Sequence, residues 1–367
     1  MIEASKGRPP CLLSSILGRA TTGGCPYHDR RYEVQNTMIH FFFIAMLFLS
    51  DFAFAQDAKL IEAAKKDGKL IVYGTMQSDI FEPLQKIFQK KTGVTVDYWR
   101  TSATKVMDRA LTEARAGKAL FDLVMSTEDT HRIMHKEGIL ARYESPMWKD
   151  FPKDAIDPQL GPRARNHIVG VMYNKSIIKP ADAPKTLEDL VKPQFRGKIV
   201  MADPTLHTTT AQWLANLHKL MGKDKADKFI RDLAAMKPIL VESFAPSADR
   251  VTTGETPIGI TYVYYVFLNG QKGAPVDYVR GDYRLLGDAS YMSLFHKAPH
   301  PNAAKAFIDF FLDDESMNLM AKNGEFVNRK GVYPPVPDAD KIKFVEMDDL
   351  GESFYAEKRK EFQKLFR

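Results

Sequence analysis

Three tyrosines that lie close together in the sequence are the residues with the clearest chemical potential. Tyr262, Tyr264 and Tyr265 follow the apolar run at 258–261, which has the composition of a buried strand. Adjacent phenols suit a hard trivalent cation, because such an ion prefers deprotonated oxygen ligands. The alternative is that the rings pack inside the fold or stack on an organic ligand. The pattern therefore predicts either a site for such a cation among these tyrosines or rings that pack in the fold or stack on an organic ligand.

Hydroxyl side chains follow several of the strands that the sequence predicts. In an open parallel sheet, ligands collect beyond the carboxyl ends of the strands, where helix N-termini direct backbone N–H groups toward them. Each hydroxyl can also be a simple helix N-cap. Together they predict an anion-binding rim. Its members are Thr75, Ser78, Ser102, Thr104, Ser126, Thr127, Thr208, Thr209 and Thr210.

Two arginines, Arg163 and Arg165, precede the predicted strand 168–174. A guanidinium group can clamp a carboxylate or a phosphate with two parallel hydrogen bonds. The alternative is a solvated position on the surface. The pair is a second candidate for binding an anionic ligand.

Two histidines could form a metal pair. His131 and His135 are four residues apart on the predicted helix 129–137, so both rings can face one way. An exported metal-dependent hydrolase that uses them with a tyrosine is therefore an alternative function. The glutamate of an H-E-x-x-H motif is missing, which favours a solvated helix face. Nucleophile-elbow, phosphate-loop and dinucleotide-binding motifs are also missing, so we expect no catalysis.

From residue 60 onward, short β-rich runs alternate with amphipathic segments. This alternation predicts βαβ units and an α/β fold. The predicted strands are 69–74, 94–100, 121–126, 168–174, 198–201, 239–242, 258–261 and 290–295. The predicted helices are 60–66, 79–91, 103–116, 129–137, 209–221, 223–236, 247–253, 302–312, 316–323 and 352–366.

The pattern breaks into a proline-containing stretch at 143–166, which predicts a boundary between two lobes. We assign 56–155 plus 287–330 to the first lobe and 156–286 to the second. Residues 331–367 form a C-terminal helical segment. If the strand 290–295 returns to the first sheet, the chain crosses between the lobes twice.

The N-terminal region predicts export. The apolar run 41–49 is well short of the ~20 residues that span a bilayer, and small residues at Ala53 and Ala55 follow it. We read 38–55 as a cleaved signal peptide and 1–37 as an over-extended gene start. Both cysteines, Cys11 and Cys25, lie in that discarded part, so the mature chain has no thiol.

The composition is that of a soluble globular protein. Of 367 residues, 44% are hydrophobic and 27% are charged, with a net charge of +6. The length suggests about two domains of ~100–200 residues each. No run of Lys and Arg with interleaved aromatics is present, so nucleic-acid binding is disfavoured.

Several segments in order resemble the solute-binding proteins of bacterial ABC importers, in the group typified by ferric-iron-binding proteins. They include KLIVYG at 69–74, GVMYNKSII at 170–178, TLEDLVKPQFRGKIVMADPT at 186–205 and TGETPIGITYVYY at 253–265. The resemblance implies a type II periplasmic-binding-protein fold of two hinged lobes, each with a mainly parallel sheet flanked by helices. It further implies a monomer in the periplasm that delivers its ligand to an inner-membrane permease with its ATPase.

The resemblance also implies site residues. In ferric members two successive tyrosines bind the metal, and these match Tyr264 and Tyr265. A histidine after the first strand often joins them, and Gln77 is the nearest match here. A glutamate after the third strand is a further ligand, to which Glu128 approximately corresponds. Ferric iron would be cargo with a synergistic anion, not a cofactor. Other relatives bind phosphonates, sugar phosphates or thiamine at a helix start that matches 205–210, so a small organic anion is the alternative ligand.

Overall fold

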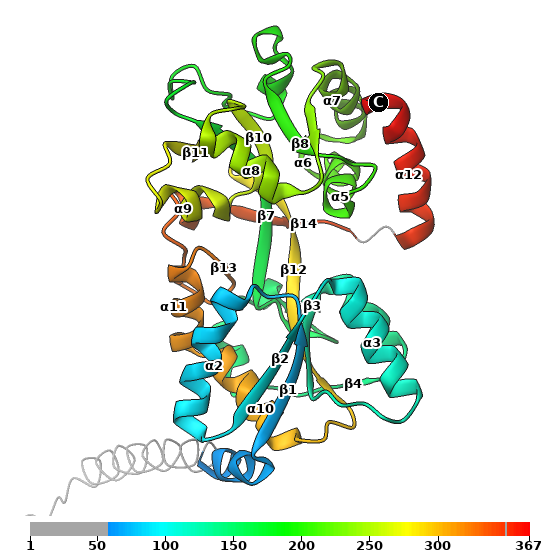
Figure 1. Ribbon diagram of the computed structural model, residues 1–367, viewed down its shortest axis with the longest axis vertical. Helices are drawn as coiled ribbons and strands as arrows, with labels where there is room; N and C mark the ends of the chain where they lie inside the picture. Colours follow the sequence, from blue (N-terminus) through cyan, green and yellow to red (C-terminus); the bar gives the residue numbers. More distant parts are fainter. Residues whose placement is uncertain (1–57, 349–350) are drawn as a thin grey trace, which may run out of the picture. The chain divides into compact units, whose positions relative to one another are not determined.

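The computed structural model describes residues 58–348 and 351–367 (Figure 1). The predicted signal peptide, the predicted gene-start extension and Cys11 and Cys25 lie outside these residues. In the described part of the chain, no helix is both long and apolar enough to cross a lipid bilayer.

The first lobe is built on three parallel strands. β1 (Lys69–Gly74) pairs with β2 (Thr95–Arg100) on one side and β3 (Leu123–Thr127) on the other. Each strand leads into a helix: α2 (Ser78–Thr92), α3 (Ala103–Arg115) and α4 (Glu128–Lys136). The predicted βα units are confirmed, with boundaries within two residues of those expected.

Two later helices complete the core of this lobe. α10 (Pro301–Phe311) and α11 (Asp314–Lys322) pack with α2, and both contribute to a cluster of buried apolar side chains. Within it, the ring of Phe307 lies 5.0 Å from Phe88 and 5.8 Å from Phe81, measured between ring centroids. Burying each such ring contributes about 1.5–3 kcal/mol. The chain therefore returns to the first lobe after building the second.

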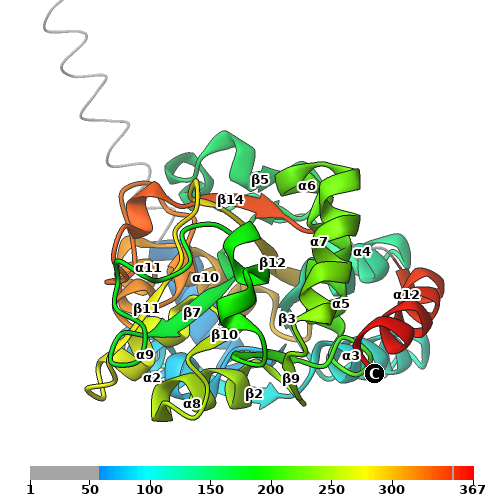
Figure 2. The ribbon, with the colours of Figure 1, turned by 90° about the horizontal axis from the view of Figure 1, so that it is seen from above.

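The second lobe has a mixed sheet with helices on both faces. Its strands are β7 (Arg165–Asn174), β8 (Ile199–Ala202), β9 (Ile239–Val241), β10 (Ile258–Tyr262) and β11 (Val276–Tyr278). β8 is parallel to β9 and β10, whereas β7 is antiparallel to β10 and β11. Its helices are α5 (Thr208–Asn216), α6 (His218–Met221), α7 (Lys223–Ala235), α8 (Phe244–Thr253) and α9 (Tyr264–Gly270). Figure 2 shows α5 and α7 on one side of β10, with α8 and α9 on the other.

Three of these helices differ from the prediction. The expected helix 209–221 is divided into α5 and α6. α8 begins at Phe244, three residues early, because Pro246 lies in its first turn, where proline is tolerated. α9 was not predicted, because its aromatic and β-branched residues have weak helix propensity.

Two long strands, β7 and β12 (Arg284–Phe295), run through both lobes. β12 pairs with β3 through Ser290–Leu294 and with β7 through Gly287–Ser290. The sheet order is β2-β1-β3-β12-β7-β10-β8-β9. Gly287 allows the close approach of the two strands, since a Cβ there would lie 2.4 Å from the carbonyl oxygen of His167. The predicted crossing by the strand at 290–295 is confirmed, although that strand begins at Arg284.

The C-terminal segment is not purely helical. β13 (Phe326–Val327) pairs with β7, and β14 (Lys343–Glu346) pairs in parallel with the first residues of β12. α12 (Gly351–Phe366) then packs against α5 and α7 of the second lobe. The strand β14 was missed because only four residues carry its pattern, after a proline-rich stretch.

Candidate functional site

The three tyrosines gather where β10 ends. Tyr262 is the last residue of β10, and Tyr264 and Tyr265 are the first two residues of α9. The rings of Tyr264 and Tyr265 stack with centroids 4.3 Å apart, and the ring of Tyr262 lies 6.0 Å from that of Tyr264. The predicted position at the carboxyl end of the strand is confirmed. We call these residues the tyrosine cluster.

Burial governs the protonation of the cluster. Burial first, and then the neighbouring hydroxyl of Tyr265, hold the pKa of Tyr264 well above its usual range. Burial also raises the pKa of Tyr265 and of Tyr262. Each of the two hydroxyls of Tyr264 and Tyr265 lies close enough to influence the protonation of the other. All three phenols are therefore neutral near pH 7, and a cation that binds them must displace protons.

Only one of the three threonines that begin α5 reaches the tyrosine cluster. The hydroxyl of Thr209 lies close enough to Tyr262 to lower the pKa of that phenol, against the larger effect of burial, which raises it. Thr208 accepts a hydrogen bond from Arg359 of α12 at 3.2 Å. Thr210 is fully buried, and its hydroxyl lies 2.9 Å from Nδ1 of His207, the N-cap of the helix. Thr209 is thus the threonine placed to meet a ligand at the tyrosines.

A buried ion pair lies beside the cluster. Arg165, the first residue of β7, is 2% exposed and pairs with Glu325 at 2.8 Å. Its Nε is buried and has no hydrogen-bond partner. The positive charge of Arg165 acts on Tyr262, while Glu325 acts on Tyr264. The predicted anion-binding role of Arg165 is compatible with this charge, and Glu325 was not predicted.

Two further polar residues flank Tyr262, and they lie on β7 and β12, the strands that run through both lobes. His167 of β7 lies opposite Asp288 of β12, and the His167 ring is 5.6 Å from that of Tyr262. Burial and then Arg165 hold the pKa of His167 well below its usual range. Asp288 contributes to the raised pKa of Tyr262. The signal that could have revealed both residues is a charged or titratable side chain within an otherwise apolar strand.

The remaining hydroxyls of the predicted rim lie at the ends of β1, β2 and β3. Thr75, Gln77 and Ser78 follow β1, and Ser102 and Thr104 follow β2. Gln77 and Ser102 occupy N-cap positions without a capping side-chain bond, so the cap interpretation is wrong for Ser102. The strand-end position is confirmed, and ligand contact by these residues stays a prediction.

The hydroxyls that follow β3 bond locally. Ser126 is buried and donates to Thr130 at 3.3 Å. Thr127 occupies the N-cap position of α4 without capping it, and its hydroxyl donates to Asp129. Their roles as ligand contacts also stay predictions.

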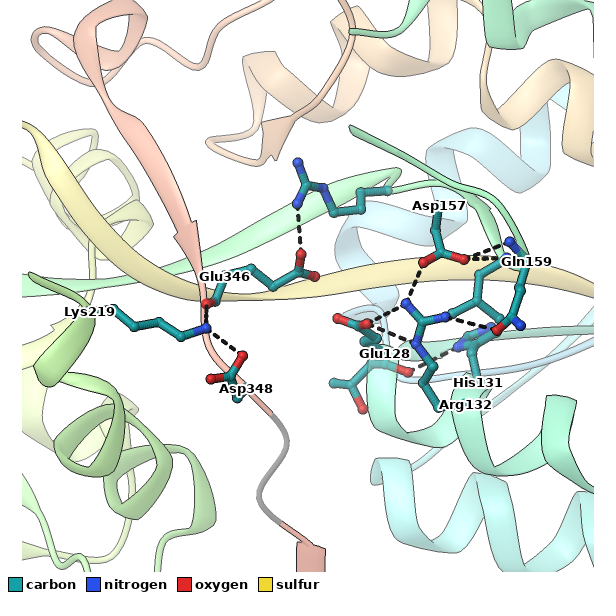
Figure 3. Close-up of polar contacts among 11 residues, drawn as sticks. Glu128, His131, Arg132, Asp157, Gln159, Lys219, Glu346 and Asp348 are labelled. Carbon is teal, nitrogen blue, oxygen red and sulfur yellow. Dashed lines mark hydrogen bonds and ion pairs between the residues drawn. The ribbon is translucent and has the colours of Figure 1, made fainter. Parts of the chain in front are cut away.

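Glu128 and Arg163 belong to a different group of residues, of which Figure 3 labels Glu128, Arg132, Asp157 and Glu346. The carboxylate of Glu128 accepts two hydrogen bonds from Arg132, at 2.8 and 3.0 Å. Arg163 donates to the carboxylate of Glu346 at 2.8 Å. We call Glu128, Arg132, Asp157, Arg163 and Glu346 the Glu346 cluster. In the structure, Glu128 is therefore paired with an arginine, and Arg163 is paired with a carboxylate.

The histidine pair is not a metal site. His131 is fully buried, and its ring nitrogens lie 3.0 Å from the carbonyl oxygen of Thr127 and 3.3 Å from that of Val124. The solvated face that we expected is therefore wrong for His131, although His135 is exposed. In the described ranges, no three His, Cys, Asp or Glu residues converge to hold a metal ion.

Residues 118–353 match the family described as bacterial extracellular solute-binding protein. This match spans more than half of the chain, so the chain belongs to that family. It is a solute-binding component of ABC transport and not an enzyme, and the hydrolase alternative is wrong.

Similar proteins include the Fe(3+)-binding periplasmic protein of Serratia marcescens, which is 23% identical over 306 residues, 79% of this chain and 86% of that protein. Iron-bound HitA from Pseudomonas aeruginosa is 20% identical, with a TM-score of 0.67 over 80% of this chain and 99% of that one. AfuA from Actinobacillus pleuropneumoniae, with exogenous fructose-6-phosphate bound, is 23% identical, with a TM-score of 0.63 over 82% of this chain and 96% of that one. The predicted type II periplasmic-binding-protein fold is confirmed.

Proposed function

We propose that this protein captures ferric iron together with a small anion and delivers it to an ABC permease of the inner membrane. The observation that carries the proposal is the pair of stacked, neighbouring phenols of Tyr264 and Tyr265 at the end of β10. Two phenolic oxygens side by side are hard ligands of the kind that a trivalent ion prefers. The names of the Serratia protein and of HitA, both iron-binding, add support.

Binding would exchange protons for metal. Each phenol is neutral in the empty site, so ferric iron displaces the protons of Tyr264 and Tyr265 as it binds. Thr209 and the charge of Arg165 act on the neighbouring Tyr262 and would hold the synergistic anion. Glu128 is not used as a ligand, because Arg132 holds its carboxylate.

Transport would follow from lobe movement. A ligand that contacts both lobes favours the closed arrangement in proportion to its differential affinity for that state. The permease with its ATPase would recognise the closed form. We expect a monomer, exported to the periplasm through a cleaved signal peptide, with no bound nucleic acid.

A small organic anion is the second candidate, and one observation favours it. Arg165 is buried with its Nε unpartnered, which suits a phosphate or carboxylate group better than a bare cation. In that case the tyrosine rings would stack on the ligand. AfuA, described with fructose-6-phosphate, is a structural relative consistent with this candidate.

The test measures iron retained by the mature chain from Gln56 after incubation with chelated ferric iron and phosphate, followed by gel filtration. We expect about one iron per chain for the wild type. Tyr264→Phe with Tyr265→Phe should retain none, and the matched control Tyr333→Phe, an exposed tyrosine, should retain iron normally. Normal retention by the double variant would refute the ferric site. Heat released by fructose-6-phosphate or phosphonates in its place would support the organic anion.

A further inference from the structure

Glu346 lies on a strand whose backbone is fixed to the second lobe. Lys219 of α6 donates to the carbonyl oxygen of Glu346 at 2.8 Å. Two residues later, the backbone N–H of Asp348 donates to Asn216 of α5 at 2.9 Å. β14 itself pairs with the part of β12 that begins at Arg284, whose side chain bonds the carbonyl oxygens of α6. The main chain at Glu346 therefore moves with α5 and α6.

The side chain of Glu346 points toward elements that pack with the first lobe, as Figure 3 shows. Arg163 donates to it at 2.8 Å and also donates to the carbonyl oxygen of Asp154 at 3.0 Å. Asp157 fixes the same segment to α4, because its carboxylate accepts from Arg132. Arg163 falls within the range 156–286 that the sequence assigned to the second lobe, but these contacts hold it against Asp154 and α4 of the first. The backbone of Glu346 is thus held by the second lobe and its side chain by groups fixed to the first.

Glu128, at the start of α4, completes the contact. Glu128 lies close enough to Glu346 to act on its protonation, and Oε1 of Glu346 is buried without a hydrogen-bond partner. Burial, and then Glu128, raise the pKa of Glu346 to about 7. Two carboxyl groups in contact avoid repulsion when they share a proton. The other charged or titratable groups around them are Arg132, Asp157, Arg163, Tyr291 and Lys219.

We infer that Glu346 is a latch between the two lobes, which stabilises the arrangement in which Arg163 and Glu128 meet the C-terminal strand. A hinge motion that separates α6 from α4 must break the contact between Glu346 and Arg163, because each partner is anchored to a different lobe. The latch therefore biases the equilibrium between lobe arrangements, and with it the apparent affinity for any ligand that requires one of them.

The inference is independent of what the tyrosine cluster binds. Among the described residues, Glu346 makes no hydrogen bond or ion pair with Tyr264 or Tyr265. The latch therefore affects the movement of the lobes and does not contact the ligand. Ligand-free protein is sufficient to test it. Failure of the ferric proposal would leave the latch standing, and failure of the latch would leave the ferric site standing.

The experiment measures the distance between two spin labels by pulsed electron resonance in the ligand-free mature chain. The labels are placed on cysteines introduced at Lys136 of α4 and Lys225 of α7, both exposed, in a sequence whose cysteines lie only at 11 and 25. We expect Glu346→Ala and Arg163→Ala to shift or broaden the distance distribution by more than about 2 Å. Glu346→Gln keeps an acceptor for Arg163 and should retain the wild-type distribution.

The matched control is Glu315→Ala, which breaks the exposed ion pair with Lys91 inside the first lobe and should change nothing. If Glu346→Ala does not fold, Glu346→Asp takes its place in the test. The aspartate keeps the negative charge, but its shorter side chain holds that charge farther from Arg163. We expect it to shift the distance distribution partially. Distributions identical to the wild type in the folded Glu346 variant and in Arg163→Ala would overturn the latch.

Discussion

The tyrosine cluster and the Glu346 cluster differ in how their polar groups are satisfied. In the tyrosine cluster, neutral phenols stack on one another with Thr209 beside Tyr262, and none of their hydroxyls takes part in an ion pair among the described residues. In the Glu346 cluster, two arginines are bound to three carboxyl groups. The first arrangement leaves oxygen ligands that a cation can recruit. The second neutralises itself, which is why we assign it to holding the lobes and not to binding a solute.

The two clusters also differ in how far apart their residues lie in the sequence. Tyr262, Tyr264 and Tyr265 are neighbours in sequence. The Glu346 cluster instead collects Glu128 from α4, Asp157 from β5 (Ile156–Asp157), Arg163 from the segment before β7, and Glu346 from β14. Neighbouring residues can be recognised from a pattern. Residues that meet only through the return of the C-terminal strand cannot, because a single sequence contains no signal for that pairing.

The largest expected effect is a loss of iron affinity at the tyrosine cluster with little change in stability. Tyr264→Phe with Tyr265→Phe should weaken ferric binding by more than about 100-fold, since even outer partners of metal ligands are worth ~10–100-fold. The same change should alter the free energy of unfolding by less than about 1.5 kcal/mol. Competition against an iron chelator and urea unfolding measure the two quantities. A large loss of stability with unchanged iron affinity would make the cluster a packing feature.

At the Glu346 cluster we expect a loss of stability without a loss of iron binding. Arg163→Met leaves the half-buried Glu346 without its cation and should lower the free energy of unfolding by about 2 kcal/mol, a value discounted for the 31% exposure of Glu346. Iron should still bind through the same tyrosines. Arg142→Met, which breaks an exposed pair with Glu144, is the control and should cost at most ~0.5 kcal/mol in urea unfolding.

The pH dependence of stability should carry a signature of Glu346. Its pKa is raised from 4.5 to about 7 in the folded chain, so the folded state binds more protons than the unfolded state between these values. The contribution of Glu346 to the free energy of unfolding is therefore fully present below pH 4.5, falls as the pH rises, and is lost above about pH 7. The difference between the wild type and Glu346→Gln in urea unfolding isolates this contribution. A pH-independent difference would contradict the shared proton.

The smallest expected effect compares two neighbouring threonines. Thr209→Val removes the hydroxyl that acts on Tyr262 and should weaken anion-dependent ligand binding by about fivefold, corresponding to ~1 kcal/mol. Thr208→Val removes only an exposed contact with Arg359 and should leave binding unchanged. Equal effects of the two substitutions on calorimetric affinity would mean that the helix start, and not Thr209, meets the ligand.

Much of the fold could be predicted from periodicity, because β1, α2, β2, α3 and α4 each bury one regular face. α9 could not, since its aromatic sequence forms a helix only in the context of the sheet edge. At the site, type and spacing indicated the tyrosine cluster, and the resemblance to ferric-iron-binding proteins narrowed the prediction to Tyr264 and Tyr265. Glu325 was not, because its role depends on the buried Arg165 that it neutralises, 160 positions earlier in the sequence.

The most direct test of the central claim is a visible absorption titration of the metal-stripped mature chain with chelated ferric iron, in the presence and absence of phosphate. Iron coordinated by Tyr264 and Tyr265 should produce a tyrosinate-to-iron charge-transfer band that saturates at about one equivalent and strengthens with the anion. Absence of the band, with tight retention of an organophosphate or carboxylate by the same protein, would contradict the ferric assignment and leave the tyrosine rings as a stacking surface.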